Sequence, residues 1–352
     1  MSGPSFPENA WYAAAWARHV AEDLLPRQVV DRKVVLYRRG DGRAVALDDA
    51  CWHRLLPLSM GRLDGEDVVC GYHGLRYGPD GRCVFMPSQE TVNPSAHVRT
   101  YPVVEEHGMV WLWPGDPALA DPATVPDLSL AARPDWAGRD RDYPLACNYQ
   151  LVVDNLLDLT HETFVHAGSI GNAAVAEAPF ETTHSGREVV LTRWMLGIEA
   201  PPFFAKHLGR PGPVDRWQII RYQAPSTVTI DVGVAPTGTG APDGDRSQGI
   251  TMQVLHTVTP STEGTCRFFW KLVRNYSLED QALTDGLFAD SESVLAEDRV
   301  VLEAQQHALD DHPDKVFYNL NIDAAAMWAR QLVTAMTAAE SGSGSFAAPS
   351  VR

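Results

Sequence analysis

Two pairs of possible metal ligands lie close together near the start of the chain, in the segment CWHRLLPLSMGRLDGEDVVCGYH. The first pair is Cys51 and His53, the second is Cys70 and His73, and sixteen residues separate the two pairs. Thiolates and imidazoles are both common ligands of transition metals. Four such side chains within one short segment therefore predict a metal centre.

The order of these ligands bears on which metal they hold. Structural zinc sites usually group two cysteines and then two histidines, or use four cysteines. Here each pair supplies one thiolate and one imidazole, which suits a [2Fe–2S] cluster with two Cys on one iron and two His on the other, as in Rieske centres. The pattern favours that cluster over zinc. Pro57, Gly61, Gly71 and Gly74 indicate that the Cys and His residues lie in loops. Four residues that only packed in a core would rarely all lie in loops.

A second polar group follows in the segment Asn155-Leu-Leu-Asp158-Leu-Thr-His161-Glu-Thr-Phe-Val-His166. In a helix expected over about residues 148–165, Asn155, Asp158 and His161 share one face. His166 does not align with that face, so a helix distortion or end is expected where both imidazoles meet one metal. Two His and one carboxylate form the facial triad of non-haem Fe(II) oxygenases, but spacing alone does not select the carboxylate.

The elements around these residues indicate an α+β fold. Short apolar runs separated by turn residues predict an all-β unit in the first third, with a hairpin at Gly40-Asp41-Gly42. The Pro- and Asp-rich segment 115–127 is typical of a linker. Further strand-like runs, and then helical patterns over about 278–339, predict an antiparallel sheet with helices packed against it. The expected domains are 1–118 and 119–340, followed by a flexible tail at 341–352.

Composition excludes several classes of function. The net charge of −16 disfavours a nucleic-acid partner, because binding to phosphates relies on Lys and Arg. No apolar run is long enough for a membrane span, and the N-terminal segment lacks the basic region of a secretory signal. Five widely spaced cysteines do not suggest a disulfide framework. A cytoplasmic protein without nucleic-acid or membrane partners is therefore expected.

The chain from Asn9-Ala-Trp-Tyr through both Cys/His pairs to NLNIDAA, near Ala325, resembles the oxygenase component of the Rieske non-haem iron aromatic oxygenases. The resemblance implies an N-terminal Rieske [2Fe–2S] domain and a catalytic domain of the helix-grip type that holds mononuclear Fe(II). One departure is Trp52, where the family often has proline, so altered packing over the cluster is expected. Glu297-Asp298, ahead of Gln305-Gln306, matches a motif of the family and marks Asp298 as the third iron ligand beside His161 and His166.

Further roles are implied by the same resemblance. Asp158 would bridge His73 of one subunit to His161 of its neighbour in a homotrimer, and Asp158 and Asn155 are the expected catalytic residues. The alternative, an aspartate that only orders its own helix, is disfavoured by the poor suitability of Asp for a mid-helix position. His256 matches a position that contacts substrate in relatives, although a hydrogen-bonded histidine on a buried strand explains it equally well.

The activity implied by the resemblance is O-demethylation of a methoxylated aromatic acid such as vanillate, with O₂ as oxidant. Electrons would come from a separate flavin and [2Fe–2S] reductase that uses NAD(P)H, since no Gly-x-Gly-x-x-Gly follows a strand here. A Rieske monooxygenase or dioxygenase acting on another aromatic substrate is the alternative. A redox carrier or zinc scaffold is an alternative of a different class, against which the second His pair argues.

Overall fold

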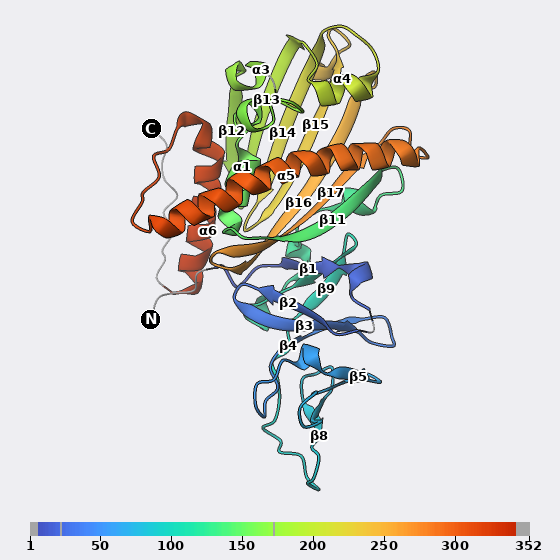
Figure 1. The fold of residues 1–352 in the computed structure, drawn as a ribbon, viewed down its shortest axis with the longest axis vertical. Coiled ribbons are helices and arrows are strands. Elements are labelled where there is room, and N and C mark those ends of the chain that lie inside the picture. Colours follow the sequence, from blue (N-terminus) through green and yellow to red (C-terminus); the bar gives the residue numbers. More distant parts are fainter. Residues whose placement is uncertain (1–5, 22, 172, 343–352) are drawn as a thin grey trace. The chain divides into compact units, whose positions relative to one another are not determined.

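The structure is a computed structural model that describes residues 6–21, 23–171 and 173–342 (Figure 1). The chain divides into two compact units, Met1–Asp127 with Thr259–Glu263, and Leu128–Val258 with Gly264–Arg352. The predicted end of the first domain, residue 118, lies inside the first unit, and the boundaries 1–118 and 119–340 stay predictions. From residue 343 onward, the predicted tail lies outside the described residues.

The first unit is built from three small sheets, with strand orders β1-β10-β9, β2-β3-β4 and β5-β6-β7-β8. The predicted hairpin is confirmed: β3 and β4 pair antiparallel, and Arg39 donates its N–H to the Arg43 carbonyl across the turn at 2.9 Å. The strands are β1 Tyr12–Trp16, β2 Leu25–Val29, β3 Arg32–Arg38, β4 Ala44–Asp48, β5 Arg62–Asp64, β6 Asp67–Val69, β7 Arg76–Tyr77, β8 Cys83–Phe85, β9 Val103–Glu106 and β10 Met109–Leu112.

The second unit is organised by one seven-stranded sheet in the order β11-β17-β16-β15-β14-β13-β12. The five central strands were expected from their apolar runs, whereas the two edge strands were not. The edge strands are polar and largely exposed, so they lack the alternation that marks a half-buried strand. The strands are β11 Ala137–Leu145, β12 Phe180–Ser185, β13 Glu188–Ile198, β14 Val214–Gln223, β15 Thr227–Pro236, β16 Ile250–Thr262 and β17 Thr265–Arg274.

The longest helix, α5 (Gln281–Asp311), crosses one face of this sheet (Figure 1). Its buried residues recur at helical spacing, and Phe288 stacks on Trp270 of β17 with ring centroids 4.5 Å apart. The predicted C-terminal helices are confirmed as α5 and α6. The other helices are α1 Tyr149–Leu157, α2 Glu162–Val165, α3 Ala173–Glu177, α4 Pro202–Leu208 and α6 Ala324–Glu340.

Among the helices that the structure describes, none combines the length and the apolar composition that crossing a membrane requires.

Candidate metal centres and substrate cavity

The two Cys/His pairs of the first unit occupy loops with the same hydrogen-bond pattern. In the first loop the Cys51 carbonyl accepts from the N–H of Leu55, and in the second the Cys70 carbonyl accepts from that of Gly74. Leu55 and Gly74 both have positive φ, at 60° and 75°. The loops also approach closely, since a Cβ on Gly61 would lie 2.1 Å from the Val69 carbonyl oxygen. Two matching turns therefore present the two pairs side by side.

The four side chains gather in an arrangement that fits a [2Fe–2S] cluster. Cys51 and Cys70 are buried in the core of the first unit and lie close enough for a thiol–thiol hydrogen bond. His53 and His73 are exposed, with ring centroids 4.7 Å apart. Thiols thus form the inner side of the site and imidazoles the outer side. The Trp52 side chain, 43% exposed, is not part of the packed core.

The helix that precedes the second polar group ends earlier than predicted. α1 stops at Leu157, and Asp158 has extended backbone angles of φ −100° and ψ 116°. The Asp158 carboxylate instead accepts the N–H of Thr160 at 2.7 Å, which forms a turn. The helix expected over about residues 148–165 is therefore interrupted at Asp158, which confirms the expected distortion, whereas the shared helix face of Asn155, Asp158 and His161 is wrong. Asp158 does order its local backbone.

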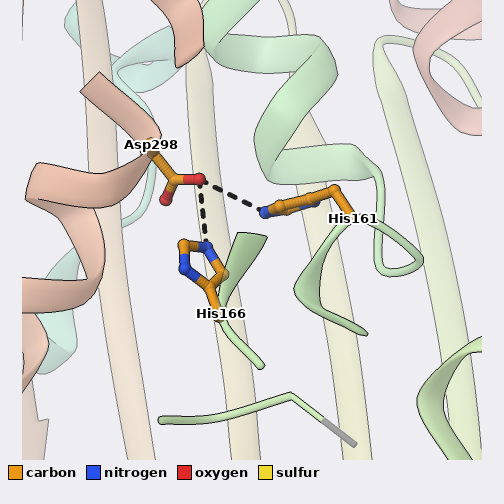
Figure 2. A group of neighbouring side chains, drawn as sticks. All are labelled: His161, His166 and Asp298. Carbon is orange, nitrogen blue, oxygen red and sulfur yellow. Dashed lines mark ion pairs between the residues drawn. The ribbon is translucent and has the colours of Figure 1, made fainter. Parts of the chain in front are cut away.

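The helix break brings both histidines to one place, because His161 and His166 flank the single turn of α2. Their ring centroids are 5.1 Å apart. Asp298 points at both of them from α5: its Oδ1 lies 3.3 Å from His161 Nε2 and 3.0 Å from His166 Nε2 (Figure 2). One ligand atom from each residue lies within 4.8 Å of the others. Two imidazoles and one carboxylate match the ligand set of mononuclear iron oxygenases.

Asp298 reaches this site because it lies on the buried stripe of α5. Val294, Asp298 and Leu302 are spaced four residues apart, and all three are buried. Burial raises the pKa of the Asp298 carboxyl, but hydrogen bonds with His161 and His166 outweigh that and lower the pKa below its usual value. Without the resemblance to the family, the sequence marks Asp298 by one signal, which is a charged residue within an apolar helical stripe.

Asn155 lies beside the same group. Its Nδ2 donates to Asp298 Oδ1 at 3.0 Å and lies 3.4 Å from His161 Nε2. The His161 Nδ1–H donates to the Asp158 carbonyl at 2.7 Å, and the Asp158 carboxylate lies 3.7 Å from the same nitrogen. Asn155 thus contacts two of the three converging side chains directly. Asp158 contacts His161 mainly through its backbone.

A buried polar cluster that the sequence analysis missed anchors the histidine loop to the sheet. Glu162 accepts hydrogen bonds from Arg216 at 2.9 Å and from Gln218 at 2.6 Å, and Arg216 also donates to the Ile170 carbonyl at 2.9 Å. Burial lowers the pKa of Arg216, while the Glu162 carboxylate opposes that shift. The sequence signal for this cluster is the pair of polar residues Arg216 and Gln218, which lie two positions apart on β14, a strand inside the sheet. Removing one partner of such a buried pair costs about 3–5 kcal/mol.

A cavity of about 130 Å³ opens beside the three converging side chains. Alternate residues of neighbouring strands point to the same face of the sheet, so β14 to β17 supply one wall. The helices α4 and α5 and the segment from Asn155 to Ile170 supply the rest. The apolar lining residues are Leu156, Leu159, Ile170, Phe203, Phe204, Ile220, Ile230, Val232, Met252, Val254, Leu272, Val294 and Leu295.

His256 of β16 lines the same cavity and is buried. Burial lowers its pKa to about 4, and its ring stacks on Phe268 with centroids 5.4 Å apart. Its Nδ1 has no hydrogen-bond partner among the described residues. Burial outweighs the opposing effect of a hydrogen bond with the Val228 backbone, so the histidine is a neutral group in the wall of a mostly apolar cavity.

Comparison with known proteins identifies a protein family for each of the two units. Residues 10–102 match the Rieske [2Fe-2S] domain, and residues 145–339 match the vanillate O-demethylase oxygenase C-terminal domain. The chain belongs to the Rieske non-haem iron oxygenases. It is 40% identical to the vanillate O-demethylase oxygenase subunit of Pseudomonas sp. strain HR199, over 95% of this chain and 96% of that one.

Two other relatives agree with this membership. A toluene-4-sulfonate monooxygenase system iron-sulfur subunit from Comamonas testosteroni is 38% identical over 96% of this chain and 99% of its own. The crystal structure of dicamba monooxygenase bound to 3,6-dichlorosalicylic acid has a TM-score of 0.89 at 34% identity, covering 96% of this chain and 99% of the other. The predicted α+β fold is confirmed. The chain is a monooxygenase component of the O-demethylase type, and its cofactors are a Rieske [2Fe–2S] cluster and mononuclear non-haem iron.

Tyr77 contacts the sulfur side of the candidate cluster site, since its hydroxyl lies 3.1 Å from Cys51 Sγ. A hydroxyl that donates to a ligand thiolate stabilises the reduced cluster and raises its reduction potential. We expect Tyr77→Phe to lower the midpoint potential by about 40 mV, the equivalent of one hydrogen bond of about 1 kcal/mol for a one-electron couple. A redox titration followed by visible absorption measures the shift. An unchanged potential would show that the hydroxyl does not act on the cluster.

Proposed function

We propose that this chain O-demethylates a methoxylated aromatic acid, with vanillate as the substrate and protocatechuate and formaldehyde as products. The observation that carries the proposal is the apolar cavity with His161, His166 and Asp298 in its wall. The vanillate O-demethylase subunit that matches 95% of the chain supports the choice of substrate. The overall reaction converts the methyl ether, O₂, two protons and two electrons into a phenol, formaldehyde and water.

The ligands of the two metal centres are part of the proposal. Cys51, His53, Cys70 and His73 would hold the cluster. In the second unit, His161, His166 and Asp298 would hold the mononuclear iron. When bound, the iron supplies O₂ activation and the cluster supplies electrons.

The remaining residues of the second site bind and orient. The apolar walls exclude water and pack against an aromatic ring, and the Asn155 amide fixes Asp298 Oδ1 by a hydrogen bond. The ring of His256, which lines the cavity, would contact a polar group of the substrate. Glu162 and Arg216 neutralise each other, so Arg216 is not assigned to the substrate carboxylate.

We propose a homotrimer in which Asp158 joins His73 of one subunit to His161 of the next. Large apolar side chains near the cluster ligands are exposed, which suits a surface that another copy covers. The Asp158 side chain remains 25% exposed and is therefore accessible to a second imidazole. The exposed apolar residues of the cluster loops are Trp52, Leu55, Met60 and Tyr72.

Electrons are proposed to come from a separate flavin and [2Fe–2S] reductase that uses NAD(P)H. The names of two relatives, as an oxygenase subunit and as the iron-sulfur subunit of a monooxygenase system, support a multicomponent arrangement. We place the system in the cytoplasm, where a reducing environment keeps the ligand cysteines available.

A monooxygenase that acts on another ring substituent is the second candidate, favoured by the similarity to the toluene-4-sulfonate monooxygenase subunit. Product analysis separates the two. We expect vanillate, O₂, a reductase and NAD(P)H to give formaldehyde and protocatechuate in equal amounts, and 4-hydroxybenzoate, which lacks the methoxy group, to give neither. Ring or methyl hydroxylation of toluene-4-sulfonate without any formaldehyde from methoxybenzoates would favour the second candidate.

His256 provides a test of substrate binding. We expect His256→Leu to raise the KM about tenfold through loss of one hydrogen bond, and His256→Gln, which keeps a polar group near the Nε2 position, to recover most of that loss. Because its pKa of about 4 keeps the imidazole neutral between about pH 6 and 8, its protonation should not change KM in that range. Steady-state kinetics measure both effects. Equal KM values for the Leu variant and the wild type would show that His256 packs in the cavity wall and does not bind the substrate.

A further inference from the structure

Glu297 and Asp298, adjacent residues on α5, contact the two opposite nitrogens of one imidazole. Glu297 Oε2 lies 2.6 Å from His166 Nδ1, and Asp298 Oδ1 lies 3.0 Å from His166 Nε2. The His166 side chain is only 2% exposed. A buried ring is therefore held at both nitrogens by carboxylates from a single turn of helix.

The other histidine of the site is held differently. His161 also donates its Nδ1–H at 2.7 Å, but to a neutral backbone carbonyl, that of Asp158. In both rings the acceptor at Nδ1 places the proton there, and the lone pair of Nε2 is left free for a metal. Of the two rings, only His166 has a carboxylate within hydrogen-bond distance of its Nδ1, since the Asp158 carboxylate lies 3.7 Å from that of His161. A carboxylate acceptor makes the ring a more basic ligand than a carbonyl would.

An ordinary ion pair on the helix surface does not explain Glu297. The positions three and four residues away on α5 are Ser293, Val294, Val300 and Val301, and none of them is a cation. His166 is its only ion-pair partner within the described part of the chain. The carboxylate is 44% exposed, yet it forms a hydrogen bond to a buried ring. Its one specific contact is with the proposed iron ligand.

We propose that Glu297 is a positioning residue of the mononuclear iron site, which fixes the tautomer and direction of His166 and strengthens it as a ligand. This rests on the proposed assignment of His161, His166 and Asp298 as the iron ligands. Glu297 does not itself contact iron or substrate. Loss of such a carboxylate behind a ligand histidine typically weakens metal affinity by about 10–100-fold.

The test compares two substitutions with a matched control. Glu297→Ala removes the acceptor, whereas Glu297→Gln keeps an acceptor oxygen of similar reach and removes only the charge. Glu292→Gln makes the same chemical change on the same helix, at a residue whose ion-pair partner is Arg141 rather than one of the two histidines. The iron-depleted protein with its cluster intact is titrated anaerobically with Fe(II), and thermal unfolding is followed in parallel.

We expect about 10–100-fold weaker Fe(II) binding for Glu297→Ala, a smaller loss for Glu297→Gln, and no change for Glu292→Gln, with similar Tm values and cluster spectra. Wild-type Fe(II) affinity in Glu297→Ala would overturn the inference. His161→Ala, titrated alongside, separates that result from failure of the ligand assignment. If the inference alone is wrong, this variant still loses Fe(II) binding, and if the assignment is wrong it binds Fe(II) normally.

Discussion

Replacing Asp298 by alanine should remove the mononuclear iron and leave the [2Fe–2S] cluster in place. The carboxylate is the only acid among the three converging side chains, and its Oδ1 is the atom on which both Nε2 atoms converge. Iron should fall from about three to about two per chain, while acid-labile sulfide stays near two. Oxygenase activity should fall to background.

Iron and sulfide analysis, together with the visible spectrum of the cluster, measures this separation. Asp285→Ala is a suitable control, because Asp285 lies on the same helix and pairs with Arg139. The control should retain all of its iron. Loss of the cluster spectrum together with the mononuclear iron in Asp298→Ala would contradict the separate ligand sets.

The second large effect is expected for Asp158→Asn, with turnover reduced by roughly two orders of magnitude. Asparagine keeps an oxygen that can accept the N–H of Thr160, so the turn after α1 should survive. It lacks the negative charge that a bridge between His73 and a neighbouring His161 requires. Both metal centres should remain bound.

Single-turnover experiments separate the two roles of Asp158. With substrate and O₂ present, the reduced cluster of Asp158→Asn should persist for much longer than that of the wild type. Asp158→Ala should behave similarly in turnover and should also lower the Tm, because the turn loses its acceptor. If the cluster of Asp158→Asn is reoxidised and product forms near the wild-type rate, Asp158 does not mediate electron transfer between the two metal centres.

Much of the fold could be predicted because its signals are local. The central strands of the large sheet alternate or run apolar, and α5 carries an apolar stripe. The Cys/His pairs stand out because four possible ligand residues, two Cys and two His, fall within one short segment. The polar edge strands β11 and β12 carry no such pattern, since exposed edges need not alternate.

The site was harder to predict, because its geometry depends on a helix end. Asp158 offers its carboxylate to the backbone of Thr160, and this local hydrogen bond ends α1 although the surrounding apolar spacing is helical. Glu297 belongs to the Glu297-Asp298 motif, but nothing in the sequence indicates its contact, because it lies next to the buried stripe and its partner His166 is 131 residues away in the chain. Contacts of that separation are fixed by tertiary packing.

The proposed demethylation is tested most directly by a single turnover without any reductase. Protein with a reduced cluster and Fe(II) is mixed with vanillate and O₂, and then quenched and analysed for formaldehyde, protocatechuate and cluster oxidation. The two electrons required, one from each metal centre, are already present in the protein. We predict equal amounts of formaldehyde and protocatechuate, formed as the cluster is reoxidised. Cluster reoxidation that depends on vanillate but yields a ring-hydroxylated product and no formaldehyde would contradict the proposed O-demethylation.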